Sequence, residues 1–241
     1  MKKTLPILLL LCLVCNRMAA QQTDISPATP QSGDIRNTYL NPVGEQAIIY
    51  SGRQQVNLYP QKIQGTAYYR QNDFQNGTLY YDGIIYTDIK LRLDTYTDEL
   101  LTLSPNNRYS IYIEPKFFES ARFKDYTIFY QKANDAMPFS GYYVQLYKNN
   151  YELIEKPKTI LTESVNGTTV VSSFQDKGKF FLVKDGQYQA VKNKNSLFNI
   201  FKETKKELKS YANESGLDFK ANPIHYMTEI IKKQEELEGK Q

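Results

Sequence analysis

The sequence predicts a mainly β fold (β-rich α+β), in which an antiparallel β-meander forms a curved sheet, sandwich or partly closed barrel and two α-helices follow at the C-terminal end. Three observations predict this class. Apolar and polar residues alternate over residues 47–130. Turn pairs containing glycine or asparagine separate the alternating segments. After residue 191, the apolar residues recur every three or four positions, as in an amphipathic helix.

The first 20 residues of the 241-residue chain have the three parts of a secretory signal peptide. Lys2 and Lys3 precede an apolar run, and small residues stand before a predicted cleavage between Ala20 and Gln21. The run is shorter than the ~20 residues of a membrane span. We therefore expect an exported protein, periplasmic or extracellular, with no transmembrane span in the mature chain.

Cleavage at this point removes both cysteines, Cys12 and Cys15. Lipid attachment at either one is disfavoured, because bulky Leu11 and Val14 precede them. Three basic residues and no acid leave with the signal, so the net charge falls from +4 to +1. That charge gives no support to a nucleic-acid partner. Residues 21–40, which follow the signal, are polar and are expected to form a flexible leader.

Residues 41–135 are expected to hold the antiparallel meander. The clearest alternation is at residues 85–93, where isoleucine, threonine and leucine alternate with tyrosine and charged residues. Aromatic and β-branched residues suit a half-buried pleated surface. Shorter predicted strands of similar composition are residues 66–69, 78–81, 100–103, 109–114 and 126–130.

Five dipeptides are predicted to reverse the chain between strands, because two-residue hairpin loops need residues that tolerate positive φ. They are Asn76-Gly77, Asp82-Gly83, Asn149-Asn150, Asn166-Gly167 and Asp185-Gly186.

Residues 131–141 are a possible boundary, and residues 136–241 are expected to contain further hairpins followed by the two helices. This second part either continues the first sheet, as one domain with 41–135, or forms a second, smaller sheet. Its predicted strands are residues 142–147, 151–155, 169–174, 179–183 and 188–191.

The first helix is predicted to begin at a cap on Asn195 or Ser196 and to end at Gly216. The second begins at Asn222-Pro223, because proline suits the first helical position. Residues 234–241 are charged and are expected to fray.

Three blocks of sequence carry a resemblance. They are residues 77–91 (GTLYYDGIIYTDIKL), residues 142–147 (YYVQLY), and KNSLF at 194–198 leading into KKEL at 205–208. With these blocks the chain resembles a group of uncharacterised exported β-rich proteins of Gram-negative bacteria. The resemblance implies a location in the cell envelope, and it implies no established activity and no site residues.

The sequence contains few of the side chains and motifs that commonly carry out catalysis. His225 is the only histidine, and no Gly-x-Ser-x-Gly elbow accompanies it. The mature chain has no thiol, and a transition-metal site usually needs clustered histidine or cysteine. No Walker loop or Gly-x-Gly-x-x-Gly sequence appears. We therefore predict no catalytic, metal or cofactor-binding residues, no cofactor and no enzymatic activity.

Acidic residues alone could support calcium binding or sugar hydrolysis, because both need only oxygen ligands or carboxyl groups. Asp82, Asp88, Asp94 and Asp98 do not have the spacing of a twelve-residue calcium loop. Alternation predicts that Asp88 and Asp94 lie on the solvated face of a strand. A sugar hydrolase would require two acids in one cleft, about 5–10 Å apart.

Tyrosine is the one compositional excess, with 20 residues. In the adjacent pairs Tyr68-Tyr69, Tyr80-Tyr81 and Tyr142-Tyr143, alternation predicts that one tyrosine of each pair faces outward. Such tyrosines either form a binding surface or are ordinary sheet residues.

These observations favour a non-catalytic binding or structural module of the cell envelope, whose partner is an unknown envelope protein. One alternative is a carrier of a hydrophobic ligand or lipid inside the curved sheet, which would require an apolar cavity. A carboxylate-dependent hydrolase is a third reading.

Overall fold

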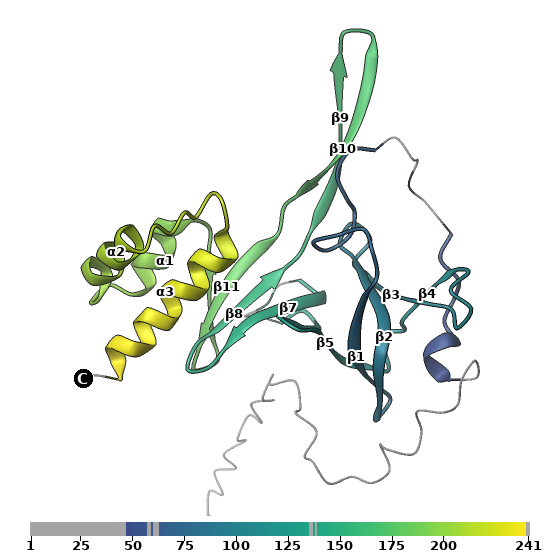
Figure 1. Cartoon of the computed structure of the whole chain (residues 1–241), viewed down its shortest axis with the longest axis horizontal. Coiled ribbons are helices and arrows are strands. Elements are labelled where there is room, and N and C mark those ends of the chain that lie inside the picture. The colour runs from purple at the N-terminus through teal and green to yellow at the C-terminus, as the bar shows by residue number, and fades with distance from the viewer. Residues whose placement is uncertain (1–46, 57–58, 60–62, 135–136, 138, 240–241) are drawn as a thin grey trace, which may run out of the picture. The chain divides into compact units, whose positions relative to one another are not determined.

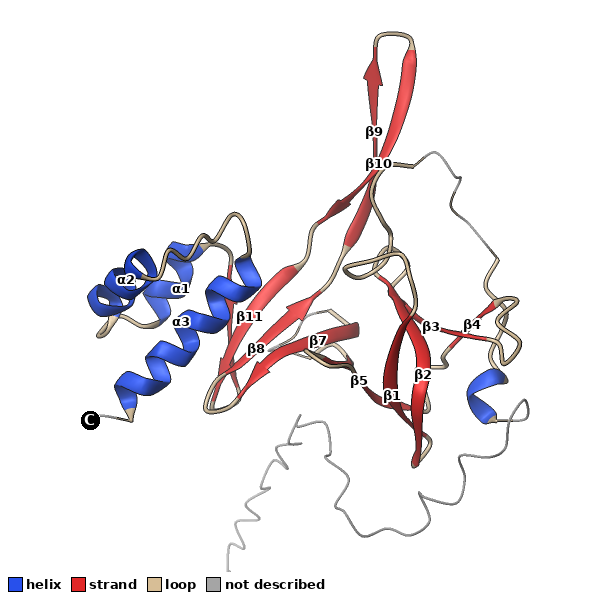
Figure 2. Cartoon of the chain, in the orientation of Figure 1, coloured by secondary structure: helices blue, strands red, loops and turns tan. Residues whose placement is uncertain are grey.

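The computed structural model describes residues 47–56, 59, 63–134, 137 and 139–239. The predicted signal peptide, the cleavage position between Ala20 and Gln21, the leader at 21–40 and both cysteines lie outside the described residues. The described part is mainly β, with three helices at its C-terminal end (Figures 1 and 2). The predicted fold class is therefore confirmed.

Ten antiparallel strands form one sheet, in the order β12-β11-β8-β7-β6-β5-β1-β2-β3-β4. The sheet is not closed into a barrel, because β12 and β4 at its ends do not pair with each other in the described part of the chain. The ten strands are β1 (Gln75–Tyr81), β2 (Ile84–Asp94), β3 (Glu99–Leu103), β4 (Ser110–Tyr112), β5 (Phe118–Arg122), β6 (Thr127–Gln131), β7 (Gly141–Lys148), β8 (Glu152–Lys156), β11 (Lys179–Lys184) and β12 (Gln187–Val191).

The sheet is continuous across residues 131–141, because β6 pairs with β7 from Thr127–Gln145 to Gln131–Gly141. A separate two-stranded sheet is formed by β9 (Thr159–Asn166) and β10 (Thr169–Asp176). These two strands and the two residues between them, which we call the arm, extend away from the ten-stranded sheet (Figure 1).

Two of the predicted turn pairs form two-residue hairpin loops as expected. Asp82-Gly83 joins β1 to β2, and Asp185-Gly186 joins β11 to β12. All four residues have positive φ, between 50° and 72°, which is the conformation that follows the twist of the flanking strands. The pair Asn149-Asn150 lies in the connection between β7 and β8.

The other two pairs were placed wrongly. Asn76-Gly77 lies inside β1, where a Cβ at Gly77 would come within 3.0 Å of the Arg122 carbonyl oxygen of β5. This glycine allows close approach of a neighbouring strand and does not form a turn. In the arm, Asn166 pairs with Thr169, so the loop is Gly167-Thr168, one residue later than predicted.

The predicted strand at residues 66–69 is also wrong. Only an isolated bridge from Tyr68 to Asp94 forms there, and Arg70, with φ of 62°, ends the extended stretch. Conversely, alternation did not reveal β5 or β9, whose sequences mix small and polar residues.

Both faces of the sheet are covered near its centre, so the prediction that one tyrosine of each pair faces outward is wrong for two of the three pairs. Tyr142 and Tyr143, adjacent on β7, are each 0% exposed. The Tyr142 side chain packs with Val144 in one hydrophobic cluster, and Tyr143 packs with Phe129 and Ile154 in another. Tyr80 and Tyr81 are both buried as well, whereas Tyr68 is half-buried beside buried Tyr69.

The predicted first helix is two helices, α1 (Lys194–Ile200) and α2 (Lys205–Glu214). The cap is Asn193, whose side chain accepts a hydrogen bond from the Ser196 amide, and not Asn195 or Ser196. The interruption coincides with a packed aromatic residue. Phe201 is buried and meets the Tyr151 ring edge-on at 5.3 Å, and the helix does not continue through this residue.

The last helix, α3 (Pro223–Glu238), begins as predicted, with Asn222 capping it and proline at its start. The predicted fraying of residues 234–241 is wrong for the described part. Gln234 is buried, and Glu235 accepts hydrogen bonds from the Tyr147 hydroxyl at 2.5 Å and the Tyr151 amide at 3.0 Å. These bonds fix the end of α3 to the β7–β8 hairpin. The three helices share one hydrophobic cluster with Leu153 and Leu182 of the sheet.

Candidate functional site

The arm and the sheet are joined by a short segment that carries acidic side chains on one face and lysines on the other. β8 pairs with β11, with Lys156 opposite Lys179, and β9 pairs with β10, with Thr159 opposite Asp176. The same register runs through both pairs, so β8–β9 and β10–β11 act as one long hairpin. We call residues 156–159 and 176–179 the junction. Pro157 and Gly178 lie opposite each other within it by this register.

Side chains alternate between the two faces of this hairpin. One face carries Glu155, Pro157, Thr159 and Asp176, and the other carries four lysines. Each face borders its own hollow, and the lysine at 158 borders both.

The first hollow has a volume of about 400 Å³. It contains charges of both signs next to aromatic rings, so its lining is not that of a purely apolar carrier. Its lining includes Tyr68, Tyr69, Arg70, Thr95, Glu155, Lys158, Asp176, Phe180 and Ile224.

Glu155 is the most perturbed acid of this hollow. It is buried, and the Tyr69 hydroxyl donates a hydrogen bond of 2.7 Å to its Oε2. Burial raises the pKa of Glu155 to about 7, and the negative charge of Asp176 adds to this, whereas the Tyr69 hydrogen bond and the Arg70 charge oppose it. Burial and the Glu155 charge also raise the pKa of Tyr69 above its usual range. Near neutral pH, Glu155 therefore exchanges between its neutral and ionised forms.

Two acids converge in this hollow. A Cβ at Gly178 would lie 2.9 Å from Glu155 Oε1 and 3.2 Å from Asp176 Oδ1, so the two oxygens are about 6 Å apart at most. Two carboxyl groups that the sequence did not single out thus share one hollow, and they are no farther apart than a carboxylate hydrolase allows.

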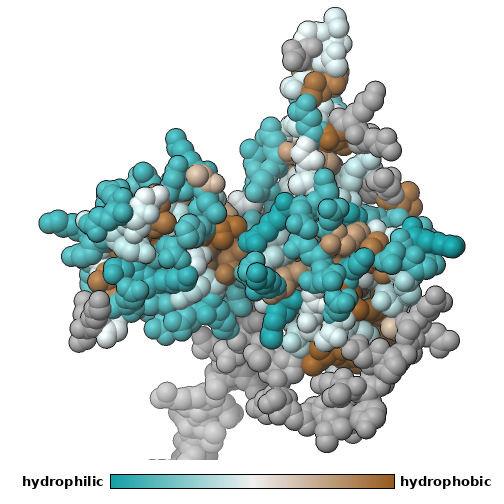
Figure 3. All heavy atoms as spheres, viewed as in Figure 1, coloured by the Kyte–Doolittle hydropathy of each residue, from teal (hydrophilic) through white to brown (hydrophobic). Residues whose placement is uncertain are grey.

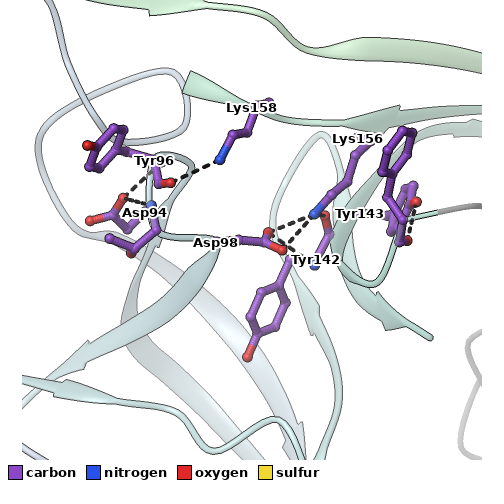
Figure 4. A network of polar contacts seen from close by, with 9 residues as sticks. Asp94, Tyr96, Asp98, Tyr142, Tyr143, Lys156 and Lys158 are labelled. Atoms are coloured by element: carbon purple, nitrogen blue, oxygen red, sulfur yellow. Dashed lines mark hydrogen bonds and ion pairs between the residues drawn. The ribbon is translucent and has the colours of Figure 1, made fainter. Parts of the chain in front are cut away.

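On the opposite face, Lys156 is held in a partly buried ion pair with Asp98 (Figure 4). Its ammonium donates to both oxygens of Asp98, at 2.8 Å each, and to the Tyr142 carbonyl at 3.0 Å. Burial lowers the pKa of Lys156, and the Asp98 carboxylate works against that shift. Gly141 leaves the space that this pair occupies, because a Cβ there would overlap Asp98 Oδ2 at 1.8 Å.

The β2–β3 loop that carries Asp98 is fixed from both ends. Asp94 accepts hydrogen bonds from the amides of Tyr96 and Thr97, at 3.0 Å each (Figure 4 shows the first). The Thr95 and Thr159 hydroxyls are 2.7 Å apart, and the Thr159 amide donates to the Thr95 carbonyl. The loop therefore ties the sheet to the base of the arm.

The four aspartates considered for calcium binding do not come together. Asp82 is in a hairpin loop, Asp88 has φ of 57° opposite an irregular pairing of β1, and Asp98 binds Lys156. Asp94 was predicted on a solvated face, and this is wrong, because it is 0% exposed and accepts the loop amides. His225 is exposed in the first turn of α3. Within the described ranges, no three metal-ligating side chains gather.

The junction was missed by the sequence analysis, although a signal exists. The triplets Lys-Pro-Lys at 156–158 and Lys-Gly-Lys at 177–179 stand at equal distances from the Gly167-Thr168 loop. Two such triplets flanking a hairpin place four lysines on one face. Glu155 has no comparable signal, because its burial depends on Tyr69, 86 positions earlier.

The architecture of the described chain is thus an open antiparallel sheet from which one long hairpin extends as an arm. No protein-family model, no curated protein and no solved structure matches the chain. None of the helices in the described part of the chain has the length and apolar character of a membrane-spanning segment.

Proposed function

We propose that the chain is an exported, non-catalytic binding module of the bacterial cell envelope, which holds a partner protein through the arm. One observation carries this proposal. Val165 and Val170 lie directly opposite each other near the end of the arm, and they are 76% and 61% exposed. Figure 3 shows apolar side chains on the arm beside polar ones and others of intermediate hydropathy.

The arm has little support of its own. A two-stranded hairpin is marginally stable in water unless something covers it. Beyond its base, the arm contacts Gln64 midway along β10, where the Gln64 amide donates to the Ser172 carbonyl at 3.0 Å and the Phe174 amide donates to the Gln64 carbonyl at 2.8 Å. Among the described strands, β9 pairs with β10 alone. Its outer edge is therefore available to a strand of the partner.

Export rests on residues 1–20, and it is tested on the full chain expressed in a Gram-negative host. The expected result is protein in the envelope fraction that begins at Gln21, as read by N-terminal sequencing. Protein with an intact N-terminus in the cytosol would contradict export.

The partner is tested in the same cells by photo-cross-linking. A photoreactive phenylalanine analogue at position 165 is expected to give one discrete adduct, which the Val170→Asp substitution in the same chain abolishes. The matched control carries the analogue at Tyr109, which is 41% exposed and lies outside the arm. An adduct that also forms at position 109, or that survives Val170→Asp, rules out the arm as the docking element.

A second function is supported by the two acids of the first hollow. A glycoside hydrolase can use one protonated and one ionised carboxyl group, and Glu155 and Asp176 line the same hollow with their oxygens at most about 6 Å apart. If the chain hydrolyses aryl glycosides, Glu155→Gln and Asp176→Asn should each lower the rate by about 100-fold or more. Glu163→Gln, on the exposed arm, is the control. Hydrolysis that persists in the Glu155→Gln variant would eliminate this function.

A further inference from the structure

The lysine face of the junction concentrates positive charge. Lys156 lies directly opposite Lys179. The Lys177 amide donates to the Lys158 carbonyl at 2.7 Å, so these two residues also face each other across the hairpin. Like charges in directly opposite positions destabilise a pair of strands. The fold therefore tolerates an unfavourable arrangement at this point.

This charge is only partly compensated. Lys156 is buried and fully engaged by Asp98 and the Tyr142 carbonyl. Among the described residues that line this face, Asp98 is the one carboxylate. Lys158, Lys177 and Lys179 are exposed and form no ion pair with a described residue. The Lys158 ammonium donates to a backbone carbonyl, that of Tyr96, at 3.2 Å (Figure 4).

The four lysines surround a pocket of about 300 Å³, which also includes Phe139 and Ser140. The Phe139 ring is 44% exposed, and the Lys179 ammonium lies 4.3 Å from its centre. The Tyr143 hydroxyl donates to the Phe139 carbonyl at 2.7 Å, which anchors this rim of the pocket. The site thus offers three uncompensated ammonium groups, one hydroxyl and one apolar surface.

We propose that this lysine pocket binds a phosphate group, with the remainder of the ligand against Phe139. A dianionic group matches the excess positive charge better than a single carboxylate does. Lysine ammonium groups bind phosphate as point charges that approach from several directions. The phosphate would relieve the repulsion between Lys156 and Lys179 and between Lys158 and Lys177.

Binding is tested on the mature chain with two probes, which separate the two sources of such a group. Inorganic phosphate is titrated by calorimetry, and phosphatidylcholine vesicles with and without phosphatidic acid are used in a flotation assay. The variant is Lys177→Gln with Lys179→Gln, because both side chains are exposed and Lys156 keeps its partner. The control is Lys202→Gln with Lys206→Gln, exposed lysines of the helical region whose loss changes the net charge equally.

The expected result is a dissociation constant at least about tenfold weaker for the junction variant and unchanged for the control. Binding of inorganic phosphate identifies a soluble phosphorylated ligand, and binding only to vesicles that contain phosphatidic acid identifies a lipid headgroup. No binding of either probe, or equal weakening by both double variants, overturns the proposal. Thermal unfolding of the variants shows that any loss of binding does not come from unfolding, because relief of repulsion should leave the junction variant at least as stable as the original chain.

Discussion

Replacing Gly141 with alanine is expected to lower the free energy of unfolding by about 3 kcal/mol or more. The new Cβ would stand 1.8 Å from Asp98 Oδ2 and 2.5 Å from the Lys156 ammonium. The ion pair would have to separate, and a buried ammonium without its carboxylate is costly. Gly141 also has φ of 129°, which an alanine rarely adopts. Denaturant unfolding followed by circular dichroism measures the loss.

Gly83→Ala is the matched control, because Gly83 has φ of 71° and no atom within 4 Å of its missing Cβ. This substitution should lower the free energy of unfolding only by the cost of backbone strain, about 1–2 kcal/mol. The excess loss in Gly141→Ala combines the disruption of the ion pair with the greater backbone strain at a φ of 129°. Equal losses in the two variants would show that the Asp98–Lys156 pair contributes nothing beyond backbone geometry.

Stability is expected to fall as pH rises from about 4.5 to 7, because of Glu155. Its pKa is raised from 4.5 in the unfolded chain to about 7 in the folded one. The folded state therefore binds the proton more tightly. The stabilisation is fully present below pH 4.5 and is lost as pH rises through 7. At 1.4 kcal/mol per pKa unit, it amounts to about 3 kcal/mol.

Glu155→Gln tests this directly, since a glutamine carbonyl can still accept the hydrogen bond from Tyr69. The variant and the original chain should have similar free energies of unfolding at pH 4.5, and the variant should be more stable at pH 8. Unfolding curves over this pH range measure the difference. A difference that does not change with pH would mean that Glu155 ionises normally in the folded chain.

The sequence was most informative where structure is decided locally. Asp82-Gly83 and Asp185-Gly186 form the predicted loops because the required positive φ depends on those residues alone. Pro223 marks the start of α3 because its fixed φ and missing amide hydrogen suit the first helical position, which is again a local property. The period-two alternation of residues 85–93 likewise identified β2, whose observed bounds are Ile84 and Asp94.

Local patterns gave wrong predictions where contacts with residues far away in the sequence determine burial or the end of a helix. Alternation assumes that one face of a strand is solvated, but both faces of β7 are covered, so Tyr142 and Tyr143 are both buried. Asp94 was assigned to solvent for the same reason, although backbone amides of the following turn satisfy it. The first helix ends at Phe201, which packs on Tyr151, and helical periodicity does not encode this contact.

The candidate site shows the same division. The lysine triplets are visible in the sequence, yet the pocket depends on Asp98 and Phe139, which come from separate connections between strands. The meeting of Glu155 with Tyr69 likewise requires the completed sheet. A single sequence therefore indicates how the lysines come together, and it does not indicate which distant residues complete the site.

The uninterrupted register from Glu152 to Val183 has a consequence for how the arm can vary in length. Trimming one residue from each strand at its outer end leaves every pairing nearer the sheet unchanged. Deleting a single residue from one strand alone would turn that strand's side chains over, because direction alternates at each step. The acid and the ammonium groups of that strand would then exchange sides, and those of the other strand would not. Balanced growth or shrinkage can thus adjust the reach of the protein while its two chemically distinct surfaces stay intact.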